Sequence, residues 1–193
     1  IQTLLAINET SNTLKIVGLT GNESHPTVIY KYHSSTPNSY VNMSLKDFKW
    51  WLREIIKALE SIHSRGVIHR DVNLGNVLCD LEKREVTLID FGLSEFYRPS
   101  IARNHKSGCI RFKAPELVAE KVNFDCAIDI WSLGICCLDI ILGMKGNWEA
   151  KDSEQVKWLI ESYFGKQWYR YARKNRIRPF VGNGDIFELA MPG

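Results

Sequence analysis

Apolar residues recur at helical spacing in one long stretch of the chain. From Leu45 to Ile62 they fall on one helical face, and the stretch lies between Ser44 and Gly66. Ser44 is followed three residues later by Asp47, which is similar to the capping box that starts many helices. Glycine commonly follows the last residue of a helix. The pattern therefore predicts an amphipathic helix between Ser44 and Gly66.

Short apolar runs on both sides of this helix predict strands. Residues 14–19 and 27–32 are separated by turn-forming residues, so we expect them to pair as antiparallel neighbours. Three further runs, 67–68, 77–78 and 86–89, are separated by polar residues and are too short for helices. We therefore expect several short strands around one long helix.

Two more helices are expected in the second half of the chain. Residues 127–142 are apolar nearly all round, which is typical of a buried helix. Residues 155–164 are amphipathic and are followed by Gly165. Between these parts, residues 93–116 form a long irregular segment, and a loop of that length in a compact domain usually has a function.

Composition narrows the class of protein. The chain has 193 residues, 45% of them hydrophobic, and a net charge of +3, so it has material for a core. The weak charge gives no argument for binding nucleic acid, and no run approaches the roughly 20 apolar residues of a membrane span. We expect neither nucleic acid nor a membrane as a partner.

The cysteine pattern indicates the compartment. Five cysteines without a C-x-x-C pair fit a reducing compartment, so we expect the nucleus or the cytoplasm.

Three polar clusters follow the long helix in a fixed order. They are His69-Arg70-Asp71 with Asn76 five residues after Asp71, then Asp90-Phe91-Gly92, then Ala114-Pro115-Glu116, and Asp129 opens the apolar helix behind them. Each cluster alone is weak evidence for a functional site. An aspartate after a strand is more often a turn former or cap than a metal ligand, and a lone histidine is more often structural. Together, in this order, they match the signature of protein kinases. From about residue 26 to residue 165 the chain resembles a eukaryotic protein kinase.

The resemblance implies an α+β fold with two unequal lobes. Residues 1–33 would be a remnant of the small antiparallel-sheet lobe with the hinge, and residues 34–193 the helical large lobe. It also implies ATP and Mg²⁺ as cofactors, with Asn76 and Asp90 as metal ligands. Both are oxygen ligands, as Mg²⁺ requires.

The catalytic set that the resemblance implies is Asp71, Arg70 and Asn73. Asp71 would accept the proton of the substrate hydroxyl, and Arg70 would pair with the loop of Asp71 and with the activation segment. His69 is assigned a structural role. For the nucleotide, the family places adenine against the backbone of Lys31 and His33, with Leu78 and Ile89 as an apolar floor.

Longer stretches are most similar to the catalytic subunit of casein kinase II, and nearly as similar to the replication-origin kinase that requires a regulatory subunit. These stretches are residues 57–66, 69–72, 88–99 and 111–117. Both relatives prefer protein substrates with acidic residues beside the acceptor. Lys106, Arg111 and Lys113 would then form an acid-reading patch. The alternative is a solvated basic loop. A regulatory subunit is a further expected partner.

The chain also departs from the kinase pattern. The glycine-rich phosphate loop and the strand lysine are absent, and we expect the chain to begin after the first half of the small lobe. Asn73 stands where serine/threonine kinases have lysine, and Cys109 where they have a small hydroxyl residue. Loss of the lysine would remove a contact of about 2 kcal/mol to the transferred phosphate. We therefore expect these 193 residues alone to transfer phosphate poorly, and the alternative function is a pseudokinase that acts as a binding module.

Overall fold

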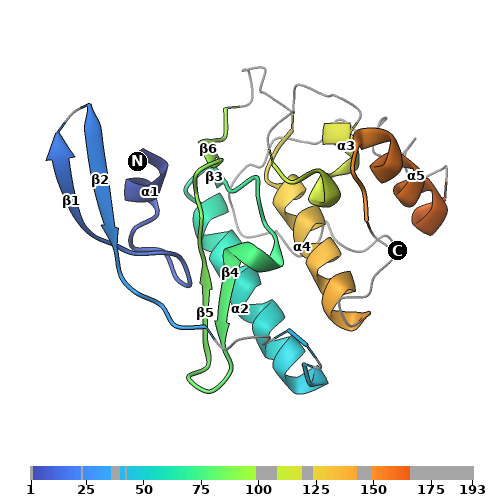
Figure 1. Cartoon of the computed structure of the whole chain (residues 1–193), viewed down its shortest axis with the longest axis horizontal. Helices are drawn as coiled ribbons and strands as arrows, with labels where there is room; N and C mark the ends of the chain where they lie inside the picture. Colours follow the sequence, from blue (N-terminus) through green and yellow to red (C-terminus); the bar gives the residue numbers. More distant parts are fainter. Residues whose placement is uncertain are drawn as a thin grey trace.

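Three small antiparallel strand pairs and two long helices are the main regular elements in the described part of the computed structural model (Figure 1). The structure describes residues 2–22, 24–35, 40–41, 43–98, 108–118, 124–142 and 149–165. The helices are α1 (Gln2–Ala6), α2 (Leu45–His63), α3 (Pro115–Val118), α4 (Ala127–Ile141) and α5 (Ser153–Phe164), with one-turn 3-10 helices η1 (Leu74–Asn76) and η2 (Ile110–Phe112). The strands are β1 (Ile16–Asn22), β2 (His25–Tyr30), β3 (Val67–Ile68), β4 (Val77–Asp80), β5 (Glu85–Leu88) and β6 (Glu95–Phe96). The expected α+β class is confirmed.

Helix α2 forms where the pattern predicted it. The Oγ atom of Ser44 accepts a hydrogen bond from the backbone N–H of Asp47 at 3.1 Å, which satisfies one of the free donors of the first turn. One face of the helix is buried, including Trp51 and Ile55 with almost no exposed surface. The chain leaves the helix after His63 and turns at Gly66, whose φ of +70° is readily adopted by glycine.

The strand predictions are confirmed with shifted ends. β1 and β2 pair as an antiparallel hairpin that runs two residues earlier on its second strand than expected, ending at Tyr30. β4 and β5 form a second hairpin, in which Val77 lies opposite Leu88 and Asp80 opposite Glu85. The long segment expected to be irregular contains β6, which pairs with β3, and it also contains η2. The short strands are stabilised by pairing with a distant segment of the same chain. Two residues are too few to show a hydrophobic period, so the pattern does not predict them.

The hairpin β4–β5 lies against α2 (Figure 1). The segment of residues 12–14 pairs with strand β5. The backbone N–H of Leu14 donates to the carbonyl of Leu88, and the N–H of Leu88 donates to the carbonyl of Asn12. This pairing, like helix α1, is not predicted by the sequence pattern. It ties the N-terminal segment to the elements that carry the polar clusters.

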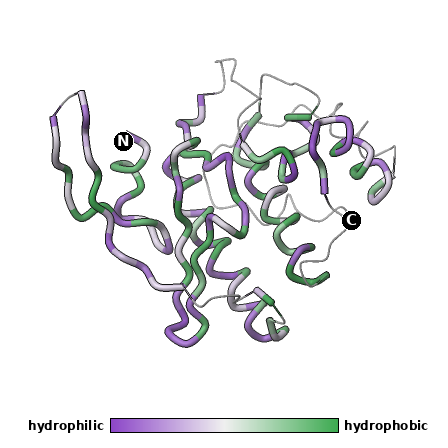
Figure 2. Tube along the Cα trace, viewed as in Figure 1, coloured by the Kyte–Doolittle hydropathy of each residue, from purple (hydrophilic) through white to green (hydrophobic). Residues whose placement is uncertain are grey.

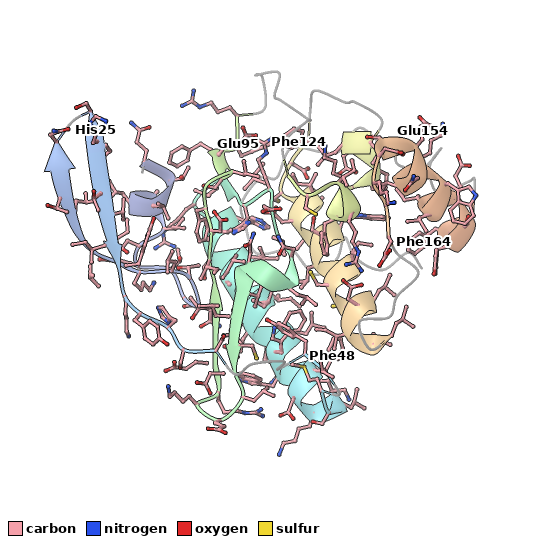
Figure 3. The ribbon with its side chains drawn as sticks, in the orientation of Figure 1. His25, Phe48, Glu95, Phe124, Glu154 and Phe164 are labelled. Atoms are coloured by element: carbon pink, nitrogen blue, oxygen red, sulfur yellow. The ribbon has the colours of Figure 1, made fainter. Side chains whose placement is uncertain are left out.

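Helices α2 and α4 supply the main core. Figure 2 shows that hydrophobic positions continue along much of α4, in line with the expectation of a buried helix. Helix α5 ends beside it, where the ring of Phe164 meets the ring of Trp131 edge-on at 5.7 Å between centroids (Figure 3). Within the described ranges, no helix combines the length and the hydropathy that crossing a bilayer requires. The division at residues 33 and 34 into two lobes stays a prediction.

Candidate active site

Asp71 lies half-buried at the centre of a loop between β3 and η1. The side-chain Nδ2 of Asn76 donates to both the carbonyl and the Oδ2 atom of Asp71, each at 2.9 Å. From the other side, the backbone N–H of Cys109 donates to Oδ1 of Asp71 at 3.2 Å. These donors fix the orientation of the carboxylate, which is what a positioned general base requires.

Asn73 holds the same loop in shape. Its Oδ1 atom accepts from the backbone N–H groups of Gly75 and Asn76, and its Nδ2 donates to the carbonyl of Asp71. It is therefore the N-cap of η1, the turn that carries Asn76. The geometry gives Asn73 a structural role in the loop, whereas its expected part in catalysis stays a prediction.

Asp90 is joined to this loop through the residue before it. The backbone N–H of Ile89 donates to the carbonyl of Asn76, and the ring Nε2 of His69 donates to the carbonyl of Ile89, both at 2.9 Å. Asp90 itself has a φ of +56°, a conformation uncommon outside glycine, and its Oδ1 accepts from the N–H of Gly92. The structure thus brings the three expected residues Asp71, Asn76 and Asp90 to one place.

The oxygen atoms at this place fit a metal bound together with phosphates. Both amide hydrogens of Asn76 face Asp71, which leaves its Oδ1 as a ligand, and Asp90 is exposed. Among the described residues, no three His, Cys, Asp or Glu side chains form a metal site by themselves. Mg²⁺ is commonly held by one or two protein oxygens plus substrate phosphates, so Asn76 and Asp90 suit that ion.

His69 is a buried structural residue, as expected. Its Nε2 must carry a hydrogen because Ile89 offers a carbonyl, and its Nδ1 therefore accepts from the backbone N–H of Asp71 at 3.2 Å. The ring also packs edge-on against Phe91. Complete burial lowers the pKa of His69, although Asp129 opposes that shift. A neutral His69 is therefore part of the folded loop.

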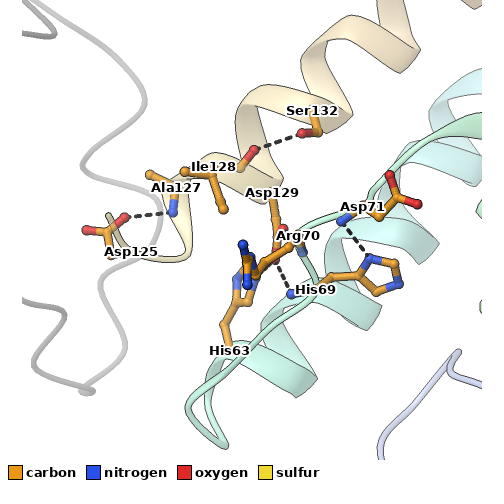
Figure 4. A network of polar contacts seen from close by, with 9 residues as sticks. All are labelled: His63, His69, Arg70, Asp71, Asp125, Ala127, Ile128, Asp129 and Ser132. Carbon is orange, nitrogen blue, oxygen red and sulfur yellow. Dashed lines mark hydrogen bonds and ion pairs between the residues drawn. The ribbon is translucent and has the colours of Figure 1, made fainter. Parts of the chain in front are cut away.

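Asp129, at the start of α4, organises the loop through hydrogen bonds to its backbone (Figure 4). Its carboxylate is 1% exposed and accepts three hydrogen bonds of 2.8 Å, from the ring of His63 and from the backbone N–H groups of His69 and Arg70. Burial alone would raise the pKa of Asp129, but the hydrogen bond and charge of His63 lower it on balance. A single buried carboxylate thus joins α2, α4 and the residues before Asp71.

Arg70 is held in an uncommon conformation by these contacts. Its φ is +71°, which is strained for a residue other than glycine. Its guanidinium pairs with Glu95 of β6 at 3.1 Å and lies over the ring of Phe124, 5.4 Å from the ring centroid. Figure 3 labels Glu95 and Phe124, the two residues that Arg70 contacts. Arg70 therefore connects the loop of Asp71 to the segment after Asp90, whereas its expected pairing with a phosphorylated activation segment stays a prediction.

Gly108 lets the chain approach this loop closely. It has a φ of +92°, and a Cβ atom there would lie 2.7 Å from the carbonyl oxygen of Arg70. The next residue, Cys109, is exposed and makes its contact with Asp71 through the backbone rather than the thiol. A side chain at position 108 would therefore displace the N–H that binds Asp71.

Gly108→Ala is expected to lower the free energy of unfolding by about 1–3 kcal/mol, because it adds both backbone strain and a clash. Chemical denaturation measures this change. Gly134→Ala is the matched control, since a Cβ at Gly134 in α4 meets nothing within 4 Å. That control should be neutral or stabilising by about 0.5–1 kcal/mol. Equal effects of the two substitutions would contradict the close approach at Gly108.

Three of the four expected nucleotide residues lie around the hairpin β4–β5. The Nδ1 atom of His33 is 3.1 Å from the hydroxyl of Thr87, which lies opposite Leu78 in the hairpin, and Ile89 follows β5. Burial, followed by the charge of Lys31, lowers the pKa of His33. The N–H of Lys31 already donates to the carbonyl of Lys15. Contact of these residues with a nucleotide stays a prediction.

Of the three expected substrate residues, the structure describes Arg111 and Lys113, and these two make different contacts. Lys113 is 9% exposed and lines a small pocket together with Arg70, Asp71 and Cys109. Arg111 instead pairs with Asp139 of α4. Lys106 lies outside the described residues. A role of Arg111 and Lys106 in binding substrate stays a prediction.

Sequence reasoning missed the parts played by His63, Gly108 and the N–H of Cys109. One signal was available, since Asp129 and Asp139 are charged residues in an otherwise apolar helix and each needs a buried partner. The sequence did not identify those partners.

In agreement with this geometry, a family model described as protein kinase domain matches residues 1–177. The chain belongs to the protein kinase family.

Proposed function

We propose that the chain is a serine/threonine kinase that phosphorylates hydroxyls next to acidic residues. The observation that carries the proposal is the carboxylate of Asp71, which Asn76 and Cys109 orient through hydrogen bonds. When bound, Mg·ATP supplies a γ-phosphate whose charge the metal partly neutralises. The substrate hydroxyl loses its proton to Asp71 as its oxygen bonds to the γ-phosphorus and ADP leaves.

The preference for acidic substrates is supported by the pocket beside Asp71. Two cationic side chains, Lys113 and Arg70, line it together with the proposed base. Burial, followed by the charge of Arg70, lowers the pKa of Lys113. An acidic side chain next to the acceptor would be attracted by both cations and would also favour the charged form of Lys113.

A matched pair of peptides tests this proposal. One serine peptide carries glutamates after the acceptor and the other carries glutamines, and transfer from Mg·ATP is measured with the full-length protein. We expect at least tenfold higher kcat/KM for the acidic peptide, and loss of that preference in Lys113→Met. Lys57→Met, at an exposed position of α2, is the control and should keep the preference.

Two outcomes would contradict the proposal. Equal rates on both peptides would remove the acidic preference, and nucleotide binding without any transfer would indicate a pseudokinase. A threonine or tyrosine in place of the serine tests the acceptor type in the same assay. The regulatory subunit is a proposal that rests on the resemblance alone, and the nuclear or cytoplasmic location is a proposal that rests on the cysteine pattern.

A further inference from the structure

Arg111 and Asp139 form an ion pair between η2 and helix α4. The carboxylate of Asp139 is almost fully buried, with 2% of its side chain exposed, whereas 27% of the Arg111 side chain is exposed. Burial raises the pKa of Asp139, and the charge and hydrogen bond of Arg111 oppose that rise. The carboxylate therefore depends on this partner to remain charged inside the helix packing.

A second contact joins the same two elements. The hydroxyl of Ser132 in α4 donates to the carbonyl of Phe112 at 2.9 Å. Ser132 and Asp139 are seven residues apart, which places them on the same side of α4 two turns from each other. Helix η2 is thus attached to α4 at two points, one through a side chain and one through the backbone.

The residues on either side of η2 are those that reach the active site. Cys109 precedes it and donates its N–H to Asp71, and Lys113 follows it and lines the pocket beside Asp71. The N-cap position of η2 has no side-chain hydrogen bond. A one-turn 3-10 helix has little stability by itself, so its position must come from contacts outside it.

We infer that Arg111 is a positioning residue, which through Asp139 holds Cys109 and Lys113 at the active site. The inference rests on the proposed function for its catalytic consequence, but the positioning itself is measured without catalysis. It assigns Arg111 an indirect role in place of direct contact with substrate. Loss of the pair would release both the N–H that orients Asp71 and the wall of the pocket.

Hydrogen exchange measures the positioning directly. In Arg111→Gln and in Asp139→Asn, we expect the amides of residues 109–113 to exchange at least tenfold faster, with core amides of α2 unchanged. A general loss of stability would instead accelerate exchange in both regions, which would overturn the inference. Arg84→Gln is the matched control, because it removes an arginine–aspartate pair with the partly exposed Asp47, far along the chain from this site.

Kinetics with the full-length protein separate positioning from substrate contact. Positioning predicts that both single variants lower kcat/KM about tenfold on acidic and neutral peptides alike, and that the double variant is no worse than either. Direct contact predicts an effect of Arg111→Gln on the acidic peptide only and none of Asp139→Asn, which would overturn the inference. If a single variant does not fold, the double variant still tests it, because it leaves no unpaired buried charge. An inactive wild type with protected amides at 109–113 would reject the proposed function but not the positioning.

Discussion

Asp71→Asn is expected to lower kcat by about a thousandfold while the protein remains folded. The amide has the size of the carboxylate, but it cannot accept a proton at neutral pH. One of its two terminal atoms becomes a donor, so it can no longer accept from both Asn76 and Cys109. Phosphate transfer from Mg·ATP to the acidic peptide measures the effect in the full-length protein.

Two controls accompany Asp71→Asn. Glu82→Gln removes an exposed carboxylate from the turn between β4 and β5 and should leave kcat unchanged. Nucleotide binding of Asp71→Asn should match the wild type, and the loss of one hydrogen bond should lower its thermal unfolding temperature only slightly. A decrease in kcat smaller than tenfold would show that Asp71 is not the proton acceptor.

Asp129→Ala is expected to lower the free energy of unfolding by about 3–5 kcal/mol. The substitution removes the acceptor of three buried hydrogen bonds, from His63 and from the backbone of His69 and Arg70. Each buried N–H left without a partner costs about 1–3 kcal/mol. The strained φ of Arg70 would also lose its support, so kcat should fall even at temperatures where the protein is folded.

Denaturant unfolding of Asp129→Ala is compared with that of Asp152→Ala. Asp152 is the N-cap of α5 and accepts one hydrogen bond, from the N–H of Gln155, at an exposed position. Its loss should cost about 1 kcal/mol. If both variants lose the same free energy, the buried network around Asp129 contributes no more than an ordinary helix cap.

Much of the local structure was predictable because its cause is local. The helix after Ser44 follows from a capping residue and a repeat of apolar positions, and both are properties of adjacent residues. The same holds for the apolar helix α4 and for the end of α5 at Gly165. The strands β3 and β6 have two residues each, and their existence depends on a partner far along the chain. For that reason the sequence showed a long irregular segment in place of β6 and η2.

The polar clusters were also readable, but the contacts between them were not. The order of His69-Arg70-Asp71, Asn76 and Asp90-Phe91-Gly92 indicated that these residues meet, and the structure joins them through the backbone of Ile89. The sequence did not indicate which donors would hold the carboxylate of Asp71. The structure uses the side chain of Asn76 and the backbone N–H of Cys109.

The sequence by itself determined that helices α2, α4 and α5 form, which polar residues are candidates for the chemistry, and the family to which their order belongs. Only the tertiary structure decided that Asp129 hydrogen-bonds the backbone before Asp71, that position 108 has no room for a side chain, and that Arg111 forms an ion pair with Asp139. The reason is physical. A helix follows from forces between residues a few positions apart, whereas a buried charge takes whichever partner the packed chain brings within hydrogen-bond distance.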